Sequence, residues 1–208
     1  NEQRVAGNLI DQKLRRIARE RSGLTPEDGR ILAMDWAPII VHEPGQGLRI
    51  RLARYHLRRA QDRPESDLQK PGRYNARRDN LTRYWREQFG RRHAIVLWER
   101  FFENVPVAGR TRRELSFGPT DGGLMYVACL YDEWRDPADP DNVLVSFAAI
   151  TDDPPEEVRQ AGHDRCPIRL TADAALRWLQ PEGQGDVQLL ALLDAGRERT
   201  PYEWREVA

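Results

Sequence analysis

Short apolar runs separated by turn signals recur along the chain, and their lengths indicate strands more often than helices. Leu48, Ile50 and Leu52 alternate with arginines directly after the glycine-rich turn at residues 45–47, which is the period-two pattern of a strand. Several other runs are aliphatic or β-branched and have the length of a strand. The predicted strands cover residues 38–43, 48–54, 93–98, 124–131, 143–150 and 202–207.

Apolar residues at helical spacing predict helices between these strands. Asn80 is a candidate cap for a helix that presents Leu81, Trp85 and Phe89 on one face, and Thr171 is a candidate cap for a later helix. The predicted helices cover residues 9–21, 80–89, 171–180 and 186–194, whereas residues 58–73 are predicted to form a polar loop. Because strands and helices do not alternate regularly, the pattern favours an α+β domain over a doubly wound parallel sheet.

The length of 208 residues suits one substantial domain, which we place at residues 1–208. No apolar run approaches the roughly 20 residues of a membrane helix, and the first residues do not resemble a signal peptide. The sequence contains two cysteines, which are too few for a disulfide framework. These features predict a cytoplasmic protein with no membrane partner.

The formal net charge is zero, but the charges are divided unevenly along the chain. Residues 49–92 contain 14 basic and 5 acidic side chains, giving +9, whereas residues 93–208 contain 12 basic and 21 acidic side chains, giving −9. A basic block within a neutral protein indicates a face for a polyanion such as nucleic acid. The alternative is a general preference for arginine, since the only lysines are Lys13 and Lys70, but that preference does not explain the clustering.

The segment AGHDRCPI at residues 161–168 gathers a histidine, an acid, an arginine and a cysteine. A zinc site needs three or four ligands and only Cys129 could add a second thiol, so we expect no metal here. Cys166 as a nucleophile is an alternative, although free cysteines are usually buried and a cysteine protease would place its histidine across the fold. His163 is the stronger candidate, because an imidazole in a loop between a helix and a strand can transfer protons near neutral pH. The alternative for His163 is that it only stabilises a turn.

Two other stretches add candidate chemistry. Asn75 lies in GRYNARRDN, where its amide can donate and accept hydrogen bonds and the neighbouring Arg73, Arg77 and Arg78 suit phosphates. Glu103 follows two phenylalanines in LWERFFENV, and a carboxylate in such an apolar setting suits proton transfer. Either residue could instead be structural, Asn75 in a turn and Glu103 at a solvated strand end.

Taken in order along the chain, these motifs resemble the SOS response-associated peptidase family. The family pattern runs N-A-R, F-Y-E-W, G-L-W-E and H-D-R-M-P. The matching segments here are Asn75-Ala76-Arg77, the aromatic pair before Glu103, Glu133-Trp134 after an aliphatic strand, and His163-Asp164-Arg165 followed by Pro167. The resemblance extends over nearly the whole chain.

The resemblance implies a single α+β domain in which curved, mostly antiparallel strands form a barrel-like core with flanking helices. It also implies covalent capture of abasic sites in single-stranded DNA by an N-terminal cysteine, whose amine and thiol close a thiazolidine on the sugar aldehyde. Autoproteolysis exposes that cysteine. Cys166 would then not be the attacking residue, because an internal cysteine has no free amine. No cofactor is implied, and we expect a monomer.

By the same resemblance, Asn75, Glu103 and His163 are the catalytic residues. Asn75 would hold the N-terminus and the opened sugar, Glu103 would move protons at the amine, and His163 would assist opening of the sugar ring. The implied DNA-binding groove includes four arginines and one tyrosine: Arg54, Arg73, Tyr74, Arg77 and Arg78. Tyr55 and Trp85 are further candidate aromatics for stacking with bases.

The chain departs from the family pattern at three places. It begins at Asn1, where the family has Met-Cys, and we expect the cysteine to precede Asn1 in the gene. The alternative is a protein that has lost the nucleophile and binds single-stranded DNA without catalysis. Tyr55 and His56 stand where the family has Trp and Gly, and Asn104 stands where it has Trp. These differences indicate a distant member with an altered DNA preference.

Overall fold

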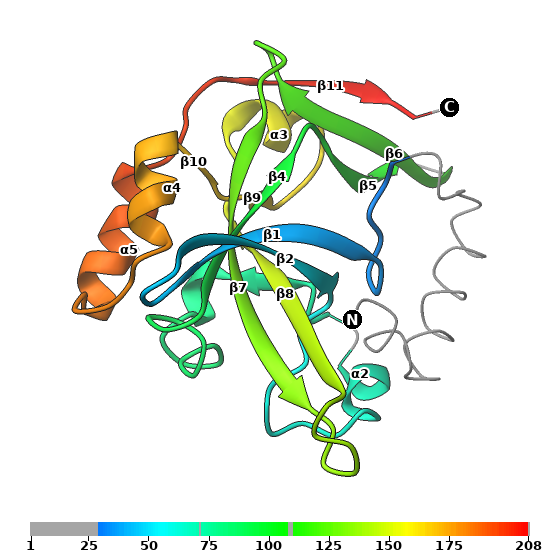
Figure 1. The fold of residues 1–208 in the computed structure, drawn as a ribbon. Helices are drawn as coiled ribbons and strands as arrows, with labels where there is room; N and C mark the ends of the chain where they lie inside the picture. Colours follow the sequence, from blue (N-terminus) through cyan, green and yellow to red (C-terminus); the bar gives the residue numbers. More distant parts are fainter. Residues whose placement is uncertain (1–28, 71, 108–109, 208) are drawn as a thin grey trace.

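The computed structural model describes residues 29–70, 72–107 and 110–207, and Figure 1 shows their arrangement. The helix predicted at residues 9–21 and the expected site around Asn1 lie outside the described residues. No helix in the described ranges is long and apolar enough to cross a membrane.

Five curved strands close into a mixed barrel in the order β7-β4-β1-β2-β8, with β8 pairing back onto β7. Every neighbouring pair is antiparallel except β2 and β8, which are parallel where Arg54 and Tyr55 lie opposite Ser146 and Phe147. The barrel strands are β1 Trp36–Glu43, β2 Gly47–Tyr55, β4 His93–Trp98, β7 Met125–Arg135 and β8 Val143–Asp152. The predicted α+β class with a barrel-like core is therefore confirmed.

Smaller elements surround the barrel. Short strands extend its sheet: β3 Asn75–Arg77 and β9 Cys166–Pro167 pair with β8, and β10 Arg169–Leu170 pairs with β7. A second sheet in the order β11-β6-β5 comprises β5 Phe101–Val107, β6 Arg110–Pro119 and β11 Tyr202–Glu206. The helices of the described ranges are α2 Ser66–Gln69, α3 Glu156–Gln160, α4 Ala172–Trp178 and α5 Asp186–Ala195, and a 3-10 turn η3 covers Arg78–Asn80.

Two apolar clusters lie on opposite sides of the barrel wall. Inward-facing residues such as Ile39, Val96 and Phe147 fill the barrel and contact the second sheet, whereas α4 and α5 cover the outer face over β4 and β7. Trp178 of α4 is fully buried there, where its indole N–H donates to the carbonyl of Ala94 at 3.1 Å. Thr171 caps α4 as predicted, because its hydroxyl accepts from the backbone N–H of Ala174.

The alternation in β2 is present, but its apolar residues face solvent. Leu48, Ile50 and Leu52 are 47%, 76% and 52% exposed, on the outer face that α4 and α5 leave uncovered. The arginine face instead points toward carboxylates, because Arg51 pairs with Glu133 of β7 and lies 3.8 Å from Glu43. Charge pairing therefore fixes which face of β2 is turned inward.

The helix predicted at residues 80–89 does not form, and the segment is a series of turns. The apolar spacing was interpreted correctly in one respect, since Leu81, Trp85 and Phe89 are all buried. The backbone hydrogen bonds have mixed spacing, because Trp85 N–H donates to the carbonyl of Asn80 whereas Gln88 N–H and Phe89 N–H both donate to that of Trp85. The guanidinium of Arg59 binds the carbonyl of Tyr84. A tertiary contact thus competes with the helical hydrogen bonds.

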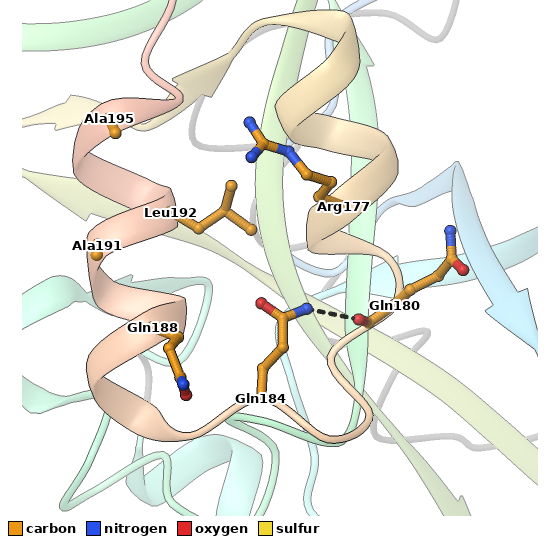
Figure 2. Close-up of a pocket in the computed structure, with 7 residues that line it drawn as sticks. All are labelled: Arg177, Gln180, Gln184, Gln188, Ala191, Leu192 and Ala195. Atoms are coloured by element: carbon orange, nitrogen blue, oxygen red, sulfur yellow. Dashed lines mark hydrogen bonds between the residues drawn. The ribbon is translucent and has the colours of Figure 1, made fainter.

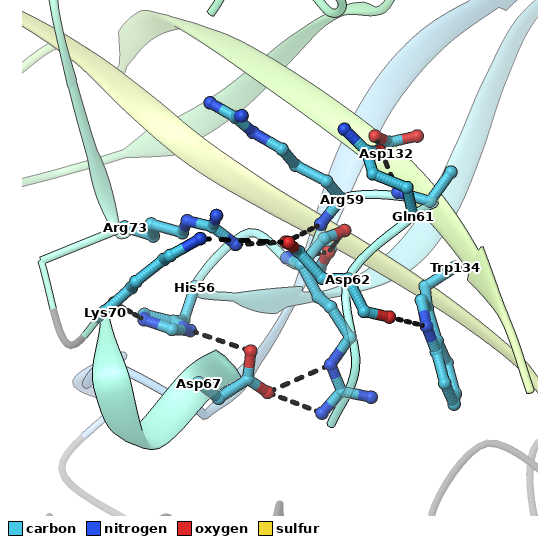
Figure 3. A network of polar contacts seen from close by, with 12 residues as sticks. His56, Arg59, Gln61, Asp62, Asp67, Lys70, Arg73, Asp132 and Trp134 are labelled. Atoms are coloured by element: carbon cyan, nitrogen blue, oxygen red, sulfur yellow. Dashed lines mark hydrogen bonds and ion pairs between the residues drawn. The ribbon is translucent and has the colours of Figure 1, made fainter. Parts of the chain in front are cut away.

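The predicted polar loop at residues 58–73 contains α2 and a buried ionic network (Figure 3). Asp67 is 1% exposed and accepts from Arg54 at 2.9 Å and from Nε of Arg58 at 3.1 Å. His56 adopts φ of 144°, a region that favours glycine, and its buried Nε2 lies 2.9 Å from the carbonyl oxygen of Lys70. Burial, assisted by Arg54, lowers the pKa of His56 to about 4, so the ring is neutral at pH 7.

We expect Asp67→Asn to destabilise the fold by about 3–5 kcal/mol, because it leaves two buried guanidinium groups without their shared carboxylate. Urea denaturation measures the free energy of unfolding. Asp79→Asn is the control, since that carboxylate is 60% exposed and should change the free energy of unfolding by no more than about 0.5 kcal/mol. Equal stability of the two variants would contradict the structural role of Asp67.

Candidate functional site

Asn75 and Tyr55 lie beside the same edge of β8. Tyr55 at the end of β2 pairs with Phe147, and Asn75 at the start of β3 pairs with Ala149, two residues further along β8. Because Phe147 and Ala149 belong to the cluster inside the barrel, the side chains of Tyr55 and Asn75 point to that interior side. The hydroxyl of Tyr55 donates to Oδ1 of Asn75 at 3.4 Å.

Glu103 approaches from the second sheet. It lies within β5 rather than at the solvated end of a strand. Phe101 and Val105, two residues before and after it on the same face of the strand, are buried. The carboxylate therefore shares the face of β5 that packs on the core, with its side chain 31% exposed.

His163 is placed by the turn that ends α3. Gly162 has φ of 100°, its N–H donates to the carbonyl of Arg159, and the N–H of His163 donates to the carbonyl of Val158. This pair of hydrogen bonds is the glycine-dependent helix end known as a Schellman motif. It directs the imidazole toward β5, where Nε2 lies 3.1 Å from Oε2 of Glu103.

Both ring nitrogens of His163 face oxygen acceptors. Nε2 faces the carboxylate of Glu103, and Nδ1 lies 2.8 Å from the carbonyl oxygen of Arg165. Burial alone lowers the pKa of His163, but the hydrogen bonds to Glu103 and Arg165 outweigh it, so the pKa is raised above its usual value. The pair can therefore hold a proton on the imidazole and an adjacent carboxylate near neutral pH.

Tyr55 contacts Asn75 and is influenced by the charge of Glu103. Burial raises the pKa of its phenol well above the usual value, and charges on Cys129, Glu103 and Tyr74 would act in the same direction. The interaction with Glu103 brings the carboxylate into the electrostatic surroundings of the phenol that contacts Asn75. The structure thus contains two polar pairs, Tyr55–Asn75 and Glu103–His163, and Glu103 influences the phenol of the first pair electrostatically.

A basic cavity opens next to Asn75. Its volume is about 300 Å³, and its cationic side chains include Lys70, Arg77 and Arg165. Arg165 follows His163 by two residues, so the cavity and the His163–Glu103 pair are joined through the same loop. Asn80, Tyr84 and Trp85 form another part of the wall. A cavity of this charge suits phosphate groups.

The arginines predicted to bind DNA occupy different surroundings. Arg77 is the most accessible, with its side chain 39% exposed and its partner Asp79 on the surface. Arg78 lies 2.5 Å from Asp194 and 3.8 Å from Asp152, so its charge is largely compensated. Tyr74 is half-buried and contacts the ring of Tyr55 edge-on.

Arg54 and Arg73 are both engaged in buried contacts, although Arg73 also lines the cavity next to Asn75. Arg54 is fully buried on Asp67, and Arg73 is 3% exposed, with its guanidinium bound to Asp62 and to the hydroxyl of Tyr84. Trp85 is 3% exposed and contributes to the wall of the same cavity. Sequence clustering of arginines counted these residues together because it does not distinguish inward from outward side chains.

Sequence reasoning missed two cations of the cavity. Lys70 was part of the basic block and Arg165 was part of the histidine motif, but neither was assigned to DNA binding. Their position depends on the return of the loop at residues 58–73 and on the turn after α3. Proximity of Arg165 to His163 in the sequence was the available signal.

The two cysteines are not suited to attack a substrate. Both are buried free thiols in the described part of the chain. Burial raises the pKa of Cys166 to about 12, and it raises the pKa of Cys129 further. Such thiols remain protonated at neutral pH.

A larger hollow of about 520 Å³ lies between α4 and α5, away from these groups (Figure 2). Its lining comprises one cation, three amides and three apolar residues: Arg177, Gln180, Gln184, Gln188, Ala191, Leu192 and Ala195. It contains no carboxylate, histidine or thiol. We therefore place the candidate site at the smaller cavity next to Asn75.

Comparison with known proteins adds independent information. The sequence model described as SOS response associated peptidase (SRAP) matches residues 6–208. No curated protein matches the chain.

Similar folds occur in solved structures. A protein from Bacteroides thetaiotaomicron is 20% identical with a TM-score of 0.69, over 84% of this chain and 74% of that one. A protein from Bordetella bronchiseptica is 17% identical with a TM-score of 0.66, over 83% and 84%. A phage-related protein from Bordetella bronchiseptica is 18% identical with a TM-score of 0.59, over 83% and 78%. At these identities the likeness concerns the fold.

We expect Glu103→Gln to lower the pKa of His163, because it removes the anionic partner of the imidazolium. Since the folded-state pKa is raised, the pair stabilises the fold fully below pH about 6.5 and loses this contribution as the pH rises through the raised value. An NMR titration of the imidazole measures this pKa. The control is Glu99→Gln, at an exposed carboxylate. An unchanged titration in Glu103→Gln would show that the contact has no electrostatic effect.

Proposed function

The chain belongs to the SOS response associated peptidase family, and on this premise we propose that it captures abasic sites in single-stranded DNA covalently. The nucleophile in this proposal is an N-terminal cysteine that the protein exposes by autoproteolysis. The observation that supports the proposal is the His163–Glu103 pair, because the loop of His163 continues to Arg165 in the wall of the basic cavity that Asn75 also lines.

The proposed reaction needs no cofactor. The open-chain sugar of an abasic site presents an aldehyde, to which the terminal amine adds with loss of water to give an imine. The cysteine thiol then adds to the imine carbon, forming a carbon–sulfur bond and returning the nitrogen to an amine within a five-membered ring. Atoms and electrons balance without an oxidant or reductant. The buried internal thiols have no adjacent free amine and cannot form this ring.

Each described site residue has a role in this scheme. His163, whose protonated form Glu103 stabilises, donates a proton to the ring oxygen as the closed sugar opens. The carboxylate of Glu103 accepts a proton from the attacking amine. The amide of Asn75 can hydrogen-bond the opened sugar or the terminal amine.

DNA binding is assigned to the cavity next to Asn75. Lys70, Arg77 and Arg165 supply positive charge for backbone phosphates, and Arg78 and Tyr74 lie beside β3 at its margin. Arg54 and Arg73 support this surface from within, by holding the loop through Asp67 and Asp62. Single-stranded DNA suits this surface better than a duplex, because an unpaired sugar can reach the half-buried imidazole of His163.

Covalent capture is tested with protein expressed from its native start codon and a single-stranded oligonucleotide carrying one abasic site. We expect a shifted band on a denaturing gel, with an intact mass equal to the adduct after loss of water. The same oligonucleotide with an intact base is the control. A native-gel shift without a covalent band would sink the capture proposal and favour the non-catalytic DNA-binding protein.

We expect His163→Ala and Glu103→Gln to slow crosslinking by about 10²-fold, the lower end of what a general acid or base contributes. DNA affinity should remain within about twofold, since the two residues form a mutually compensating ion pair and neither lines the cavity. Time courses on denaturing gels measure the rate. Cys166→Ala is the control and should crosslink at the parent rate, because its thiol is buried and protonated. Loss of all activity in Cys166→Ala would indicate a different nucleophile.

We expect Arg77→Ala to weaken binding of single-stranded DNA and to reduce the slope of log affinity against log salt by about one. The reason is the loss of one phosphate contact at the exposed guanidinium. Arg177→Ala is the matched control, because it removes an exposed arginine from α4 at the other hollow. Identical salt titrations for the two variants would exclude Arg77 from the DNA surface.

A further inference from the structure

The phenol of Tyr55 lies in the middle of the proposed site but has no role in the scheme above. Its hydroxyl donates to Oδ1 of Asn75, and its electrostatic surroundings include Glu103. The family pattern has tryptophan at this position, and an indole has no hydroxyl. A hydroxyl at this position is therefore a departure from the family pattern.

The ring of Tyr55 is held on several sides. It stacks on Phe147 with centroids 5.0 Å apart, and Tyr74 and Trp98 pack against it edge-on at 5.8 and 6.0 Å. Its backbone is equally constrained, because its N–H donates to Asp35 and its carbonyl accepts from Met34, each at 2.7 Å. The hydroxyl consequently has a fixed position relative to Asn75.

The hydroxyl is suited to donate a proton in a hydrogen bond and unsuited to give it up. Burial and the nearby ionisable groups keep the phenol protonated well beyond neutral pH. Rotation of an amide side chain exchanges the positions of its oxygen and its NH₂ group. A hydrogen bond to the oxygen therefore determines in which direction the NH₂ group points. A donor fixed beside Oδ1 directs Nδ2 of Asn75 away from Tyr55.

We propose that Tyr55 is a positioning residue, which fixes the amide of Asn75 so that Nδ2 is presented as a hydrogen-bond donor to the oxygen of the opened abasic sugar. This inference rests on the proposed function, because it assigns the ligand of Asn75 within that reaction. The oxygen–oxygen distance of 3.4 Å is longer than usual for a hydroxyl donor, so we expect the contact to add little to stability. The proposed role of the contact is to orient the amide.

The kinetic test is a double-mutant cycle with Tyr55→Phe and Asn75→Ala. We expect Tyr55→Phe to slow crosslinking about 3- to 10-fold, with thermal stability and DNA affinity unchanged. In the Asn75→Ala background the same substitution should have less than about a twofold effect. Tyr126→Phe is the control, since this partly buried tyrosine of β7 packs on the outer side of the barrel and should keep the parent rate.

A crosslinking rate of Tyr55→Phe equal to that of the parent would overturn the proposal. Equal slowing by Tyr55→Phe in the parent and in the Asn75→Ala background would do the same.

NMR supplies a readout that does not depend on crosslinking. Tyr55→Phe should shift the side-chain amide resonances of Asn75, and Tyr126→Phe should not. If the parent protein forms no crosslink, the proposed function fails while this shift still decides whether Tyr55 orients Asn75. Unshifted Asn75 resonances in Tyr55→Phe would exclude the orienting contact.

Discussion

Closure of the barrel depends on strand β8, whose edges hydrogen-bond to four other strands. One edge pairs with β7 and then with β9, while the other pairs with the end of β2 and then with β3. Eight of its ten residues are buried, so apolar packing on both faces opposes any shift of register. Because Phe147 and Ala149 are fixed in this way, Tyr55 and Asn75 meet although a polar loop separates them in sequence.

The arginines of residues 49–92 divide into two groups with different physical roles. Arg54, Arg58 and Arg73 point inward and bind Asp67 and Asp62, which organises the loop between β2 and β3. Others remain on the surface, where they can contribute to a positive field. The net charge of residues 49–92 is the same whether an arginine side chain points inward or outward. Sequence charge therefore indicated a polyanion-binding region without showing which side chains reach solvent.

Strands and short motifs could be predicted well because their signals are local. The apolar runs located β1, β2, β4, β7, β8 and β11, and the order of the motifs indicated the family. The hairpin of β5 and β6 was missed, since charged residues interrupt its pattern. The helix expected at 80–89 is replaced by turns, in which Arg59, distant in sequence, binds the carbonyl of Tyr84. The proximity of Glu103 to His163 depends on packing between two sheets, which no local pattern encodes.

The outward stripe of Leu48, Ile50 and Leu52 has a consequence for behaviour at high concentration. In the described part of the chain, the outer edge of β2 pairs with β8 only at Arg54 and Tyr55, so an apolar strand edge faces water. Such edges recruit further strands and promote aggregation. Arg49 and Arg51 alternate with the stripe in sequence but lie on the opposite face of β2, where Arg51 is paired with Glu133. The exposed stripe of β2 therefore favours association between copies of the folded chain at high concentration.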